Sequence, residues 1–78
     1  MAKLPQITAK ELIKILEKIG FKVMRQEGSH VFLRNNDGKT TVVPNHPGEK
    51  LDRGLLNKIL KKDVGISREE FERLFKIL

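Results

Sequence analysis

Two histidines are the side chains of this 78-residue chain that are best suited to acid–base chemistry. One ends the tripeptide Gly28-Ser29-His30, and the other, His46, lies in a polar stretch over 45–50. An imidazole titrates near neutral pH, so His30 can take a proton from one oxygen and return it to another. RNA offers a matching substrate, because its own 2′-hydroxyl attacks the adjacent phosphate once it is deprotonated. Such a cleavage needs a base, an acid and positive charge near the phosphate, but no metal ion.

Each of these residues also has a plain structural interpretation. His30 fits an exposed polar residue beside a turn, and Gly28 fits a bulge or a tight entry into a strand. We interpret His46 as a solvated loop residue. The residues alone therefore leave open whether His30 is catalytic, and whether His46 or a lysine supplies the second proton transfer.

Metal and cofactor sites are not indicated by the sequence. The chain has no cysteine, so neither disulfides nor thiolate ligands can support the fold. With only two histidines, a metal site would need carboxylates at a suitable spacing, and the acidic residues fall mostly at expected caps and turns. Neither a glycine-rich phosphate loop nor a nucleophile elbow occurs. We expect no metal and no cofactor.

The charge balance indicates a polyanionic partner. Sixteen basic residues against ten acidic ones give a formal net charge of +6, but composition does not separate RNA from DNA, an anionic membrane or an acidic protein. Lys58, Lys61 and Lys62 are by default the solvated side of a helix. The nearby Lys50, Arg53 and free amides of a helix start favour phosphate binding instead. The candidate RNA contacts are Ser29, Lys50, Arg53, Lys58 and Lys61. The chain has four phenylalanines and no tryptophan or tyrosine, so Phe32 is the only plausible platform for base stacking, which is a minor expectation.

The element before the histidine motif is a helix over 9–19. Thr8 and Glu11 have the spacing of a capping box, and Ile7 and Leu12 occupy the two positions of a hydrophobic staple. Gly20 supplies the left-handed residue that ends the helix.

Three strands are expected next, over 21–26, 29–34 and 39–43. The turn between the last two is Asn35-Asn36-Asp37-Gly38, and Pro44 ends the third strand. Short connections imply an antiparallel meander. In the first strand, the residues expected to point one way are Phe21, Val23 and Arg25. In the second, Val31 and Leu33 are expected to face the helices. The residues of that strand on the open face are then His30, Phe32 and Arg34.

Two further helices complete the chain. Asp52 caps one over 53–63, which Gly65 ends, and Ser67 begins a second capping-box-plus-staple pattern for the last helix, over 68–77. The residues that this helix is expected to bury are Phe71, Leu74, Phe75 and Leu78. The order is αβββαα, an α+β fold in which helices cover one face of a three-stranded antiparallel sheet.

Length and composition predict one domain over 1–78, because 38% apolar residues suffice for one small core. No apolar run approaches the ~20 residues of a membrane helix. The first residues lack a signal-peptide core. We therefore expect a soluble, cytoplasmic protein.

From about residue 10 to 72, the chain resembles the HicA toxins, also called YcfA-like proteins. No single matching segment is specific, but their ordered set is. The segments are Ile19-Gly20-Phe21, Arg25-Gln26-Glu27-Gly28-Ser29-His30, Asn36-Asp37-Gly38, Val42-Val43-Pro44-Asn45-His46, Gly54-Leu55-Leu56-Asn57-Lys58-Ile59-Leu60 and Val64-Gly65-Ile66-Ser67-Arg68-Glu69-Glu70-Phe71.

The resemblance implies an mRNA interferase on a fold like that of double-stranded-RNA-binding domains. The family's active histidine falls on His30, and a HicB-type antitoxin is the implied protein partner that masks the site. The chain departs from the family pattern at Asp52, where proline is expected, and at Arg53, where lysine is usual. Asp52 still caps a helix and Arg53 keeps the charge, so neither changes the expectation.

Three functions follow from these observations. The leading hypothesis is the toxin of a type II toxin–antitoxin system, a metal-independent endoribonuclease in which His30 acts as general base or acid. A non-catalytic RNA-binding module would use the same basic surface to recognise A-form shape. A protein-interaction module would use the positive charge for an acidic partner. Strand scission separates the first hypothesis from the second.

Overall fold

The computed structural model describes residues 5–78, and its elements confirm the predicted α+β order αβββαα. Each strand begins and ends within one residue of its predicted bounds. The elements are α1 (Ala9–Lys18), β1 (Lys22–Glu27), β2 (His30–Arg34), β3 (Thr40–Pro44), α2 (Arg53–Lys58), the π-helical η1 (Ile59–Val64) and α3 (Arg68–Lys76).

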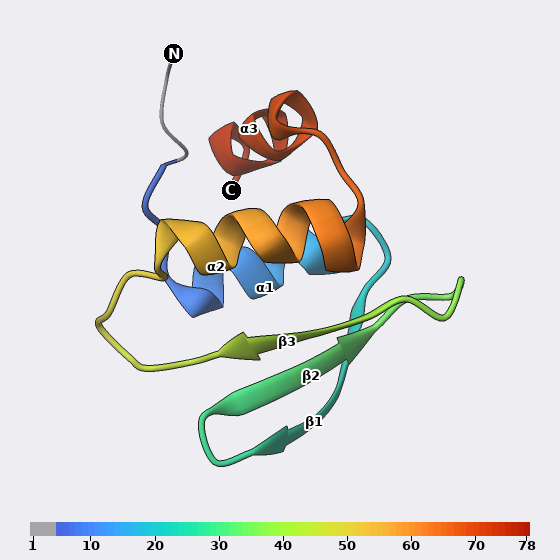
Figure 1. Ribbon diagram of the computed structural model, residues 1–78, viewed down its shortest axis with the longest axis vertical. Coiled ribbons are helices and arrows are strands. Elements are labelled where there is room, and N and C mark those ends of the chain that lie inside the picture. Colours follow the sequence, from blue (N-terminus) through green and yellow to red (C-terminus); the bar gives the residue numbers. More distant parts are fainter. Residues whose placement is uncertain (1–4) are drawn as a thin grey trace.

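The three strands form one antiparallel sheet in the order β1-β2-β3. Figure 1 shows α1 and α2 over the same side of this sheet, with α3 on the far side of that helix pair. Both α1 and η1 contact β3, whereas α3 contacts α1. The core lies between the helices and the sheet, and no helix among residues 5–78 covers the opposite, open face of the sheet. No helix within residues 5–78 is long and apolar enough to cross a membrane.

Local hydrogen bonds explain where α1 begins. The Thr8 hydroxyl accepts the Glu11 amide at 3.2 Å, and the Glu11 carboxylate accepts the Thr8 amide at 2.9 Å, which confirms the capping box. The bond from the Thr8 amide holds the pKa of Glu11 below its usual value, because it favours the charged carboxylate. Ile7 and Leu12, the predicted staple, are fully buried.

The turn between β2 and β3 forms as predicted. The Asn35 side-chain oxygen accepts the amides of Asp37 at 3.0 Å and Lys39 at 2.8 Å. Gly38 has a φ of +87°, which suits glycine. This turn fixes the register in which Leu33 pairs with Thr41.

A β-bulge in β1 corrects one prediction. Met24 is an extra residue between the pairs Val23–Leu33 and Arg25–Phe32. The extra residue shifts the alternation by one, so Val23 lies opposite an inward residue and Arg25 opposite an outward one. The prediction that Val23 and Arg25 point the same way is therefore wrong.

The predicted helix over 53–63 is continuous, but its second half is wound as a π-helix. The Gly65 amide donates to the Leu60 carbonyl at 2.8 Å, and Gly65, with a φ of +78°, ends the helix as predicted. The buried Thr41 hydroxyl of β3 donates to the Asp63 carboxylate at 2.9 Å, which fastens η1 to the sheet.

The last helix packs on α1, not on the sheet. Its N-terminus is capped by Ser67, and Phe71 is fully buried, as predicted. Leu74 and Phe75 are half-buried against the core. The prediction that Leu78 is buried is wrong, because α3 ends two residues earlier and leaves this side chain 46% exposed.

Candidate nucleic-acid interface

His30 is the first residue of β2, directly after a two-residue turn. Gly28, the first residue of that turn, has a φ of +59°, which this position of a type II′ hairpin turn requires. Val31 and Leu33 are buried against the helices, so the alternation places His30 on the open face, where it is exposed. The predicted facing of β2 is confirmed.

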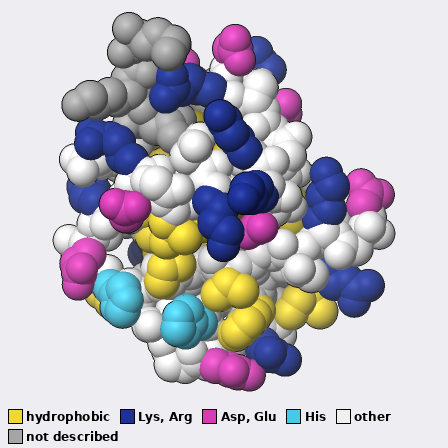
Figure 2. Space-filling view, in the orientation of Figure 1, with side chains coloured by type: hydrophobic (Ala, Val, Ile, Leu, Met, Phe, Trp, Pro, Cys, Tyr) yellow, Lys and Arg dark blue, Asp and Glu magenta, His cyan; other side chains and the backbone are white. Residues whose placement is uncertain are grey.

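The pairing of β2 with β3 brings His46 to the same end of the sheet. His30 pairs with Pro44, and the Asn45 amide donates to the Ser29 carbonyl at 2.6 Å. His46 follows directly and is exposed. This connection keeps the two histidine Cα atoms within about 13 Å of each other. Figure 2 shows both imidazoles on one face of the molecule, close together in that view.

Sequence reasoning treats His46 as a solvated loop residue and does not place it beside His30. The two residues are 16 positions apart in the sequence, and their proximity depends on the β2–β3 register. This proximity could have been predicted from the position of His46, which lies two residues beyond Pro44, the residue of β3 that pairs with His30.

Lys50 is held beside the start of α1. It forms an isolated antiparallel bridge with Thr8, and the next amide, that of Leu51, donates to the Ile7 carbonyl at 2.7 Å. The Lys50 side chain is exposed, and its charge contributes, after the Thr8 hydrogen bonds, to the lowered pKa of Glu11. Lys50 therefore has an acidic neighbour as well as access to solvent.

Asp52 changes what the start of α2 can bind. Its carboxylate accepts the Leu55 amide at 3.1 Å, so it occupies a donor that a phosphate oxygen would otherwise contact. It also places negative charge at the positive end of the helix. The backbone phosphate site predicted here is thereby weakened. The neighbouring Arg53 is exposed, so its side chain remains a candidate contact.

The helix lysines that the sequence singles out are accessible to solvent. Lys58, Lys61 and Lys62 are exposed along α2 and η1. Figure 2 shows Lys and Arg side chains gathered over α2 on the face that also displays both histidines. A phosphate chain crossing this face would therefore meet both positive charge and the imidazoles. Within residues 5–78, no three His, Cys, Asp or Glu side chains are grouped so that they could hold a metal ion.

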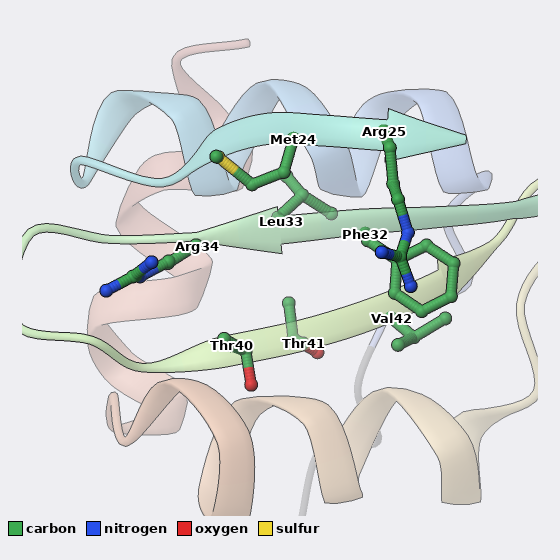
Figure 3. Close-up of a pocket in the computed structure, with 8 residues that line it drawn as sticks. All are labelled: Met24, Arg25, Phe32, Leu33, Arg34, Thr40, Thr41 and Val42. Carbon is green, nitrogen blue, oxygen red and sulfur yellow. The ribbon is translucent and has the colours of Figure 1, made fainter. Parts of the chain in front are cut away.

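A shallow hollow of about 440 Å³ lies on the sheet beyond His30 (Figure 3). The Arg25 guanidinium lies over the Phe32 ring, 4.4 Å from its centroid, and the Arg25 Nε is 3.0 Å from a Glu27 carboxylate oxygen. Strand pairing places Phe32 between Arg25 and Val42. Phe32 is predictable from the sequence as a stacking platform, but Arg25 is not, because the bulge that brings them together has no evident signal in the sequence.

These features define a small basic α+β domain whose open sheet face presents a histidine, an aromatic ring and cationic side chains. The family model described as HicA toxin of bacterial toxin-antitoxin matches residues 9–66, which include α1 through η1 and both histidines. The chain belongs to the HicA toxin family, as the resemblance predicted. It is thus the toxin of a toxin–antitoxin pair, and the family implies a cognate antitoxin as its partner. No curated protein matches the chain.

Proposed function

We propose that this toxin is a metal-independent endoribonuclease that cleaves mRNA and uses His30 for acid–base catalysis. The observation that carries the proposal is the exposed imidazole at the start of β2, on the basic face of a HicA-family chain. Because mRNA is the proposed substrate, the cytoplasm is the proposed place of action. A HicB-type antitoxin is the proposed partner that masks this face.

In the proposed reaction, His30 takes the proton of a ribose 2′-hydroxyl. The resulting oxygen attacks the adjacent phosphorus, and the bond from that phosphorus to the 5′-oxygen of the next nucleotide breaks. The departing 5′-oxygen takes a proton from a second residue, which acts as the acid. The products are a 2′,3′-cyclic phosphate and a 5′-hydroxyl. Nearby cations stabilise the negative charge that develops on the phosphorane.

We assign the second proton transfer to His46. The Asn45–Ser29 hydrogen bond places the start of the loop beside β2, so an imidazole from each side can reach one phosphate. Lys50 is the alternative donor, but it lies beside Thr8 and Glu11 at the start of α1, and within the described part of the chain no hydrogen bond ties it to β2 as the Asn45 amide ties the loop before His46. His46→Ala should therefore slow cleavage, and Lys50→Gln should mainly weaken RNA binding.

The remaining candidate residues are proposed to hold phosphates. Arg53, Lys58 and Lys61 are exposed along α2 and η1 and supply positive charge there. Ser29 is half-buried beside His30 and offers a hydroxyl to the same phosphate. Because Asp52 caps α2, these side chains, and not the helix amides, carry the phosphate contacts in the proposal.

The test uses a structured mRNA incubated with the purified protein in excess EDTA. We expect discrete fragments that end in a 2′,3′-cyclic phosphate. A single 2′-deoxy substitution at the cleaved nucleotide should abolish that cut and leave the others, because it removes the attacking hydroxyl. Intact RNA that shifts on a native gel would instead support the non-catalytic RNA-binding module. Intact and unbound RNA would support a module that binds only protein.

A further inference from the structure

We propose that the open face of the sheet stacks one unpaired base of the RNA substrate on the Arg25 guanidinium, which is itself supported by the Phe32 ring. The proposal rests on the proposed function and extends it. It names a base-binding subsite beside the nucleotide that is cut.

The two side chains already form a cation–π contact. The Arg25 guanidinium lies 4.4 Å from the Phe32 ring centroid, and Figure 3 shows it in front of the ring. The guanidinium is planar and delocalised, so its second face can stack on a base. That second face is accessible, because the Arg25 side chain is 62% exposed. The Glu27 carboxylate, 3.0 Å from the Arg25 Nε, forms an exposed ion pair with it.

The subsite is correctly placed relative to His30. His30 and Phe32 alternate on one strand and share the open face, about 7 Å apart along the chain. Arg34 continues the same row, and its exposed guanidinium can contact the next phosphate. A strand of RNA with its phosphate at His30 can therefore set the neighbouring base on Arg25.

The chemistry of the hollow favours a base over a protein side chain. Val42 and Met24 supply apolar walls, while Arg25 over the ring and Arg34 at the other end of the hollow attract a phosphodiester and repel other cations. The volume of about 440 Å³ lies within the ~300–1,000 Å³ typical of small-ligand sites. The formal charge of +6 adds general attraction for RNA. In the alternative interpretation, Arg25 only shields Phe32 from water. The experiment must distinguish this role from base stacking.

The experiment measures stacking without cleavage. A short single-stranded RNA carries 2′-deoxyribose at the cut nucleotide and 2-aminopurine at one position at a time. We expect the wild-type protein to quench the fluorescence at one position next to the cut. Arg25→Lys keeps the charge but loses the plane, so it should abolish that quenching and weaken binding about fivefold or more. Phe32→Leu should also reduce the quenching, because it removes the support.

The matched control is Arg73→Lys, the same exchange at an exposed position of α3. It should leave both quenching and affinity unchanged. Wild-type quenching and affinity in Arg25→Lys would overturn the proposal, and so would the absence of any quenched position in the wild type. If the wild type stacks a base but cuts no RNA, the subsite stands and the proposed nuclease activity fails. If it cuts RNA without stacking, only the subsite fails.

Discussion

The stability of α3 depends on one fully buried phenylalanine. Phe71 has no exposed surface, and its ring centroid lies 6.2 Å from that of Phe75, in the helix that packs on α1. The family match ends at residue 66, before this helix begins. Truncating a buried phenylalanine to alanine costs about 3–5 kcal/mol, the lost transfer energy plus the cavity. A domain of this length has a total free energy of unfolding of about 4–12 kcal/mol. Phe71→Ala should therefore remove a large part of the stability of the protein.

Urea unfolding followed by far-UV circular dichroism measures this loss. We expect a much lower midpoint for Phe71→Ala, with a similar dependence on urea if the unfolding remains a single transition. Phe75→Ala is the control, because the same truncation at a half-buried position should cost less. A Phe71→Ala midpoint equal to that of the wild type would refute the reasoning and would mean that α3 is not part of the cooperative core.

Three further predictions concern the bonds that hold the elements in place. Glu11→Gln should be less stable than the wild type above the usual pKa of glutamate. The free energies of unfolding of the two proteins should converge as the pH falls through the lowered pKa of Glu11. A constant difference between their acid unfolding curves would contradict this. Thr41→Val leaves Asp63 without its donor and should cost about 1–3 kcal/mol in urea unfolding; an unchanged midpoint would show that the bond adds nothing. Gly65→Ala forces a side chain into a left-handed position and should lower the thermal midpoint by the equivalent of about 1–2 kcal/mol; an equal or higher midpoint would contradict it.

Sequence signals predicted the elements whose ends are set by local chemistry. The Thr8–Glu11 capping box and the Asn35 turn appear where the residue types place them, because each bond joins residues within one turn of the chain. The bulge at Met24 and the π-helical turns of η1 were not predictable in this way. Both features occur where one element meets another. The bulge lies in the pairing of β1 with β2, and η1 contacts β3, where its Asp63 accepts a hydrogen bond from Thr41.

The candidate site likewise combines features that the sequence predicts with features that depend on contacts between elements. The outward facing of His30 follows from the apolar alternation of its own strand and was predictable. The nearness of His46 and the cation–π contact between Arg25 and Phe32 follow from strand pairing, which the sequence pattern does not specify to the residue. The Asp52 cap of α2 was predictable from the sequence and is confirmed, whereas phosphate binding at this helix start stays a prediction.

The central claim is that His30 performs acid–base catalysis of RNA cleavage. Its most direct test compares the single-turnover cleavage rates of the wild type and His30→Ala in excess EDTA, with RNA saturating for both proteins and with affinity measured in parallel. We predict that the rate falls by about 10²–10⁴-fold while RNA affinity and the unfolding midpoint are retained. A His30→Ala protein that cuts at the wild-type rate would contradict the account and leave His30 an ordinary surface residue.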